Sequence, residues 1–165
     1  MQGSGRTGLA MDEEFETAGV AAPPPLIFGV ALALGLALSR LQPQAEQGAR
    51  FARALGAASV VAGIALGAAT IAALKRAGTN LDPYKPSTAL VTGGVFAFSR
   101  NPAYVAATSI YVGIAMYAGS LPAFILLPVA LALLDRLVVN PEERYLARRF
   151  GDEYRRYYEA VPRWF

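Results

Sequence analysis

Two short polar segments hold the residue types that could bind a charged ligand, residues 100–102 (Arg-Asn-Pro) and 140–143 (Asn-Pro-Glu-Glu). Arginine presents a fork of N–H donors to carboxylates and phosphates, whereas glutamate can bind an ammonium group or accept a proton. Both segments also have the form of a helix start, with Asn as the N-cap and Pro at the first helical position. Capping alone explains much of each segment, but a helix start is also an anion site, so the two interpretations are compatible.

The sequence contains no cysteine and no histidine. The lack of cysteine excludes disulfides, a thiolate zinc site and a cysteine nucleophile. The lack of histidine removes the usual general base near neutral pH and the commonest metal ligand. Any chemistry must therefore use carboxylates, Arg, Lys, Tyr, the backbone, or a cofactor with its own reactivity, and we expect no metal site.

Long uncharged runs indicate which elements position the two polar segments. Charged residues make up only 16% of the chain and apolar residues 55%, whereas roughly 25% of the residues in a typical soluble domain are charged. No charged residue occurs in residues 17–39, 54–74 or 101–134. Apolar runs of about 18 or more residues are typical of membrane-spanning helices. The expected fold is therefore an all-α polytopic membrane protein.

About four transmembrane helices are expected, over residues 21–41, 54–74, 102–118 and 121–139. The last two derive from one uncharged run of 34 residues. As a single helix this run would be about 51 Å long, against a hydrocarbon core of about 30 Å. The run must therefore fold back, and residues 119–122 (Gly-Ser-Leu-Pro) are the obvious break.

Outside these helices we expect a flexible polar tail over residues 1–18 and a single membrane domain over residues 19–165. That domain includes a cytoplasmic loop, residues 75–100, and an amphipathic cytoplasmic helix within residues 140–165. Lysine and arginine concentrate in this loop and this helix, so the positive-inside rule places both termini in the cytoplasm. Because a tight turn makes the third and fourth helices neighbours, the two polar segments should meet at the cytoplasmic rim.

Several sequence blocks in the second half of the chain resemble a known family. They are residues 78–83 (Gly-Thr-Asn-Leu-Asp-Pro), 90–94 (Leu-Val-Thr-Gly-Gly), 99–104 (Ser-Arg-Asn-Pro-Ala-Tyr), 142–143 (Glu-Glu), 150–154 (Phe-Gly-Asp-Glu-Tyr) and 161–164 (Val-Pro-Arg-Trp). In order and spacing they resemble the isoprenylcysteine carboxyl methyltransferase and phospholipid methyltransferase superfamily of integral membrane methyltransferases. The resemblance implies that S-adenosylmethionine binds between the last membrane helices and the carboxyl-terminal tail, and that the substrate arrives from the lipid side.

The resemblance also implies site residues, because the family's Arg-His-Pro-x-Tyr and Glu-Glu segments contribute to the cofactor site. Carried over to this chain, the cofactor-binding residues are Arg100, Asn101, Pro102, Tyr104, Glu142, Glu143 and Tyr154. Among them Arg100 and Glu143 are expected to serve catalysis, and Arg163 is a further candidate for the site. Asn101 stands where many members of the family have His. Asparagine can donate and accept hydrogen bonds but cannot act as a base near neutral pH.

The expected function is therefore that of an S-adenosylmethionine-dependent methyltransferase in a bacterial inner membrane. Its acceptor would be a lipophilic or amphipathic carboxylate, thiol or amine that enters from the membrane, and no nucleic-acid partner is expected. Two alternatives remain open. One is a non-catalytic membrane protein of the same fold, which the Asn in place of His would suit. The other is a membrane NADPH-dependent reductase, because sterol reductases share a similar carboxyl-terminal pattern.

Overall fold

The computed structural model describes residues 18–41, 49–80 and 85–164, and these ranges contain helices and no strand. The helices are α2 (Pro24–Ser39), α3 (Ala49–Arg76), α4 (Pro102–Ala118), α5 (Leu121–Leu134) and α6 (Asn140–Ala160), with a 3₁₀ turn η1 (Gly94–Ala97) and a π turn η2 (Asp135–Val139). The prediction of an all-α fold is confirmed. Apart from Ala18, the predicted polar tail lies outside the described residues.

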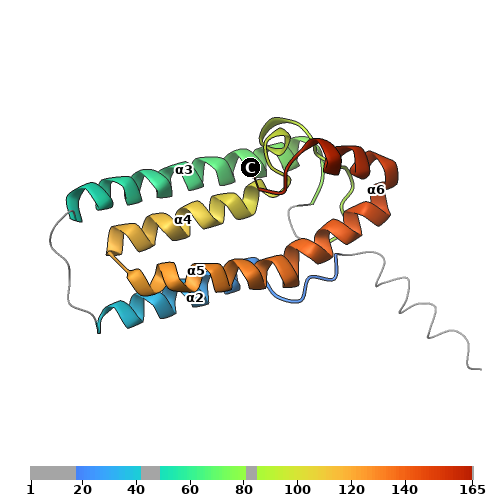
Figure 1. The fold of residues 1–165 in the computed structure, drawn as a ribbon. Helices are drawn as coiled ribbons and strands as arrows, with labels where there is room; N and C mark the ends of the chain where they lie inside the picture. The colour runs from blue at the N-terminus through green and yellow to red at the C-terminus, as the bar shows by residue number, and fades with distance from the viewer. Residues whose placement is uncertain (1–17, 42–48, 81–84, 165) are drawn as a thin grey trace, which may run out of the picture.

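Close helix packing holds the bundle together. Helices α3, α4 and α5 run side by side with α2 against α5, and the carboxyl-terminal half of α6 turns back toward the start of α4 (Figure 1). Glycines form the closest contacts. A Cβ on Gly56 of α3 would lie 2.6 Å from the Gly113 carbonyl oxygen of α4, and a Cβ on Gly35 of α2 would lie 2.5 Å from the Cα of Ala123. Small residues let helix backbones approach in this way.

The turn between α4 and α5 forms where the sequence predicts it. Gly119 ends α4 with a positive φ of 64°, a conformation that favours glycine. Ser120 then caps α5, since its hydroxyl accepts a hydrogen bond from the Ala123 N–H at 3.2 Å. This turn places the start of α4 and the end of α5 at the same end of the bundle, which is where the polar segments meet (Figure 1).

Within the described residues, two helices are long and apolar enough to cross a membrane, by length and composition: Arg50–Arg76 and the continuous helical stretch Leu121–Ala160. Only the first part of the second stretch is apolar, because charged residues recur throughout α6. The apolar part of this stretch is therefore α5. Helices α2 and α4 have 16 and 17 residues, which corresponds to about 24–26 Å of helix.

Helix α3 contains the predicted span, residues 54–74, and extends beyond it at both ends, from Ala49 to Arg76. Two local predictions are wrong. Asn140 does not cap a separate helix, because its φ and ψ of −63° and −42° are helical and the chain passes from α5 through η2 into α6 without a break. The amphipathic helix is not continuous, because Gly151 (φ 52°, ψ −124°) kinks α6.

The backbone hydrogen bonds explain why Pro141 does not end the helix. A proline inside a helix lacks the N–H that would bond to the carbonyl four residues earlier, here that of Leu137. The Ala21 N–H donates to this Leu137 carbonyl at 3.1 Å instead. Because a distant part of the chain supplies the missing donor, the carbonyl stays satisfied and the helix continues.

The glycine contacts give a paired prediction. In Gly56→Ala the new methyl group would meet backbone atoms of α4, so we expect a loss of about 1–3 kcal/mol of stability. Gly67→Ala is the matched control on the same helix, since its Cβ would lie 3.8 Å from the Ala106 Cβ, an ordinary contact. Thermal unfolding in detergent should show a lower Tm for Gly56→Ala and an unchanged or higher Tm for Gly67→Ala. Equal Tm values would contradict the packing described.

Candidate functional site

The two polar segments lie together at one end of the bundle, as predicted. The Tyr104 hydroxyl on the first turn of α4 donates to a Glu142 carboxylate oxygen on α6 at 2.9 Å. One residue farther along α6, Glu143 lies 3.4 Å from Nη2 of Arg100. Asn101 occupies the N-cap position of α4, but its side chain makes no cap. Its amide instead donates to the Arg163 carbonyl at 3.3 Å.

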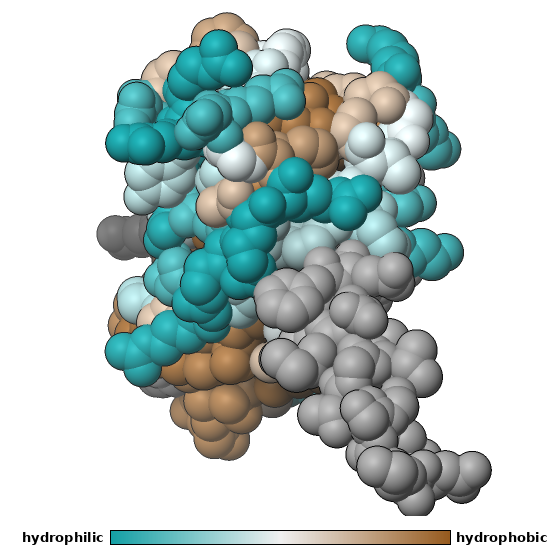
Figure 2. Space-filling view, turned by 90° about the vertical axis from the view of Figure 1, so that its right-hand side faces the viewer, coloured by the Kyte–Doolittle hydropathy of each residue, from teal (hydrophilic) through white to brown (hydrophobic). Residues whose placement is uncertain are grey.

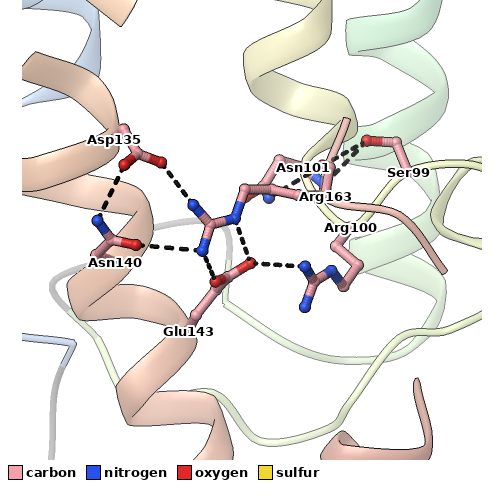
Figure 3. Close-up of polar contacts among 7 residues, drawn as sticks. All are labelled: Ser99, Arg100, Asn101, Asp135, Asn140, Glu143 and Arg163. Carbon is pink, nitrogen blue, oxygen red and sulfur yellow. Dashed lines mark hydrogen bonds and ion pairs between the residues drawn. The ribbon is translucent and has the colours of Figure 1, made fainter. Parts of the chain in front are cut away.

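Glu143 is the centre of a charged network (Figure 3). Arg163, from the segment after α6, donates to both Glu143 carboxylate oxygens. The same guanidinium contacts Asp135 at 2.7 Å and the Asn140 side-chain oxygen at 3.2 Å. The Glu143 side chain is 11% exposed. With two arginines on one carboxylate, Glu143 has little capacity left for a ligand.

Arg100 has unused hydrogen-bonding capacity in a buried place. Its side chain is 7% exposed, and its Nε and Nη1 atoms have no hydrogen-bond partner. Its guanidinium carbon lies 3.7 Å from the centroid of the Tyr158 ring, a cation–π contact. Buried N–H groups without acceptors cost free energy, so an anionic ligand at Nε and Nη1 would remove that cost.

A cavity of about 510 Å³ lies in front of these groups, a size typical of small-molecule sites. Its walls come from the first turns of α2 and α4, the end of α3, the loop before α4, and α6. Most of the wall is apolar, for example Phe28, Leu74, Leu90, Val91 and Phe96. All seven predicted cofactor-binding residues line it: Arg100, Asn101, Pro102, Tyr104, Glu142, Glu143 and Tyr154. Their roles remain predictions, and Arg163 does not line this cavity.

Burial shifts the pKa of two groups that line the cavity, Glu142 and Tyr154. Burial raises the pKa of Glu142 to about 7, with the Tyr104 hydrogen bond acting against the rise and the neighbouring Glu143 carboxylate adding to it. Burial also raises the pKa of Tyr154 to about 12, with Glu143 adding to the rise and the nearby Arg100 acting against it. Tyr154 therefore stays protonated at neutral pH, and Glu142 can change its charge there.

Two tyrosines of α6 hold the loop over the cavity. The Tyr145 hydroxyl accepts from the Ser87 N–H at 2.9 Å, and the Tyr157 hydroxyl donates to the Phe96 carbonyl at 2.8 Å. Both side chains are buried. Tyr157 lies on the apolar face of the predicted amphipathic helix, at helical spacing from Phe150 and Tyr154. Tyr145 is off that spacing, so its role depends on the tertiary fold and could not be predicted from the sequence.

The described residues contain no group of three or more His, Cys, Asp or Glu side chains that could hold a metal ion. The polar groups that line the cavity are instead a cation with free donors, carboxylates and tyrosine hydroxyls. Such a set suits an organic ligand that carries both a negative and a positive charge.

Comparison with known proteins gives two matches. The family model described as phospholipid methyltransferase matches residues 51–153. A stretch of 73 residues, 44% of this chain, is 34% identical to the protein-S-isoprenylcysteine O-methyltransferase of Schizosaccharomyces pombe. The match covers 31% of that relative, so the chain corresponds to about a third of its length. No solved structure matches significantly. These matches confirm the resemblance to the isoprenylcysteine and phospholipid methyltransferase superfamily.

The loop contact gives a testable expectation. Tyr145→Phe keeps the ring but removes the acceptor of the Ser87 N–H, which costs about 1 kcal/mol. We expect faster hydrogen–deuterium exchange in the loop that follows residue 85, with little change within α4. Tyr117→Phe is the control, because Tyr117 is exposed and remote from the loop. An unchanged exchange rate in Tyr145→Phe would show that this hydroxyl does not hold the loop.

Proposed function

Since the chain belongs to the phospholipid methyltransferase family, we propose that it is an integral membrane enzyme that transfers a methyl group from S-adenosylmethionine to a lipophilic or amphipathic acceptor. The observation that carries this proposal is the pairing, in one cavity, of a buried arginine with two free donor atoms and a glutamate that can ionise near pH 7.

The cavity suits the amino-acid part of S-adenosylmethionine. That part carries a carboxylate and an ammonium group. In the proposal Arg100 binds the carboxylate through its unpaired N–H groups, a charge-assisted contact. Glu142 binds the ammonium, because its carboxylate accepts a hydrogen bond from Tyr104 and contacts no arginine among the described residues, whereas Glu143 already contacts two arginines. Asn101, Pro102, Tyr104 and Tyr154 complete the wall around these groups.

These contacts define what the methyl donor and the protein each contribute to the reaction. S-adenosylmethionine, when bound, supplies a methyl group made electrophilic by its sulfonium. The protein must then orient the donor, admit the acceptor and exclude water. Arg100 orients the donor, and Glu143 serves catalysis by holding the Arg100 guanidinium in the cavity wall. A carboxylate or thiolate acceptor needs no base, which is consistent with a chain that has no histidine.

The acceptor is proposed to reach the cavity from the membrane. Pro25 and Phe28 of α2 and Thr70 and Leu74 of α3 line the cavity on its membrane side. These helices expose large apolar side chains to the surroundings, for example Val30 at 58% and Val61 at 66%. Apolar surfaces this large usually face lipid or a partner. A lipid or lipid-linked molecule could therefore enter between α2 and α3.

The topology belongs to the same proposal. We place α2, α3, α4 and α5 with η2 across a bacterial inner membrane, with both termini in the cytoplasm. At the molecular end that carries α6, hydrophilic side chains dominate the upper and middle parts, with hydrophobic areas near the top and at the lower left (Figure 2). Helices α2 and α4 are short for a hydrocarbon core of about 30 Å, and a locally thinner bilayer would accommodate them.

A binding titration tests the proposal. The purified protein in mild detergent should bind S-adenosylmethionine and S-adenosylhomocysteine in calorimetry. Arg100→Ala should weaken both by roughly tenfold to a hundredfold, since a hydrogen bond to a charged group contributes about 1.5–3 kcal/mol. Arg155→Ala is the control, because Arg155 is 75% exposed and pairs only with Glu159 in the described structure. If folded wild type binds neither ligand, the methyltransferase proposal is wrong, and NADPH is the next ligand to titrate.

The pKa of Glu142 predicts how binding depends on pH. Below about pH 7 the carboxyl group is mostly neutral, and a neutral acid binds an ammonium group less well than a carboxylate does. Affinity for S-adenosylhomocysteine should therefore rise about tenfold between pH 6 and pH 8. In Glu142→Gln the affinity should be lower at pH 8 and nearly independent of pH. A flat wild-type profile would contradict the assignment of the ammonium to Glu142.

A further inference from the structure

The segment that follows α6 joins two distant parts of the rim. Its backbone carbonyls accept hydrogen bonds from the residues just before α4: Pro162 from the Arg100 N–H at 3.0 Å, and Arg163 from the Ser99 hydroxyl at 3.1 Å. Its Arg163 side chain turns the other way, to the junction between α5 and α6 (Figure 3). The segment therefore fastens the start of α4 to α6.

The π turn η2 explains how one guanidinium reaches three side chains. In an α-helix, residues five apart point in clearly different directions, about 140° apart. A π turn bonds residue i to residue i+5 and brings them nearly into line. Here the Asn140 N–H bonds to the Asp135 carbonyl, and the Asn140 amide also donates to the Asp135 carboxylate at 3.0 Å. Glu143 is three residues farther along, on the same face.

Each nitrogen of the Arg163 guanidinium has an acceptor, and the side chain does not line the cavity. It is therefore not in position to touch a ligand there. Arg163 acts on the site through Glu143, because Arg163 and Arg100 both form an ion pair with that carboxylate. The planar guanidinium of arginine suits this arrangement, because its separate N–H groups can donate hydrogen bonds to Asp135, Asn140 and Glu143 at the same time.

We propose that Arg163 is a positioning residue, which holds Glu143 against Arg100 and so fixes the Arg100 guanidinium in the cavity wall. The π turn places the Asp135, Asn140 and Glu143 side chains on one face, where all three accept hydrogen bonds from Arg163. This inference rests on the proposed function in so far as Arg100 binds the methyl donor. The attachment of the carboxyl-terminal segment by Arg163 does not depend on that function.

A double-mutant cycle distinguishes positioning from direct contact. S-adenosylhomocysteine is titrated into wild type, Arg163→Gln, Glu143→Gln and the double variant. If Arg163 acts through Glu143, each single change weakens binding by about tenfold and the double change by little more than either. A loss of about a hundredfold in the double variant, the product of the single effects, would show that Arg163 acts independently and would overturn the inference. So would unchanged binding in Arg163→Gln.

Asp135→Asn is the second variant, and it changes neither Glu143 nor Arg100. It weakens one acceptor of Arg163, so binding should fall by a few-fold, in the same direction as for Arg163→Gln. Arg155→Gln, at an exposed ion pair, is the matched arginine control and should bind like wild type. An effect of Arg155→Gln equal to that of Arg163→Gln would overturn the inference.

A measurement without ligand separates this inference from the proposed function. Trp164, next to Arg163, is the single tryptophan of the chain, and it packs partly buried against the core. Release of the segment should shift its fluorescence emission to longer wavelength and increase quenching by acrylamide in Arg163→Gln, but not in Arg155→Gln. Unchanged emission in a folded Arg163→Gln would overturn the attachment. If wild type binds no methyl donor but Arg163→Gln shifts the emission, the proposed function fails and the attachment stands.

Discussion

The ion pairs of Glu143 with Arg100 and Arg163 are the interaction on which the rest of the site depends. All three side chains are more than two-thirds buried, so each charge needs its partners. A buried charge that loses its partner is strongly unfavourable, whereas a complete network is tolerated. The network joins the start of α4, the start of α6 and the segment after α6. The geometry of the cavity wall is therefore set by charge pairing as well as by helix packing.

Adjacent glutamates acquire different properties from this arrangement. Glu143 faces two guanidinium groups, while Glu142 receives one tyrosine hydroxyl and is otherwise buried. Burial raises the pKa of Glu142 to about 7. Two chemically identical side chains in adjacent positions thus have different surroundings, ion pairs for Glu143 and a buried hydrogen bond for Glu142. Environment, and not residue type, assigns these roles.

Much of the fold follows from residue patterns. The long uncharged runs indicate the apolar helices, and Gly119 with Ser120 marks the turn between α4 and α5. Connectivity through that turn then predicts that Arg100 and Glu143 lie at the same end. These features depend on local sequence and on one tight connection. Local physics is sufficient to predict them.

Other features depend on residues far apart in the chain. Asn140 and Pro141 have the sequence of a helix start, yet the helix continues because Ala21 bonds to the Leu137 carbonyl. The part played by Asp135 depends on the π turn and on Arg163, and that of Tyr145 on a loop 58 residues away. The spacing of residues in the sequence does not indicate any of these distant partners.

The most direct test of the central claim is an experimental structure with saturating S-adenosylhomocysteine. The ligand should lie in the cavity of α4 and α6, with its carboxylate at Nε and Nη1 of Arg100 and its amino group at Glu142. Arg163 should keep its contacts with Asp135 and Glu143. Ligand density elsewhere, or a bound ligand that leaves the Arg100 nitrogens without a partner, would contradict the proposed site.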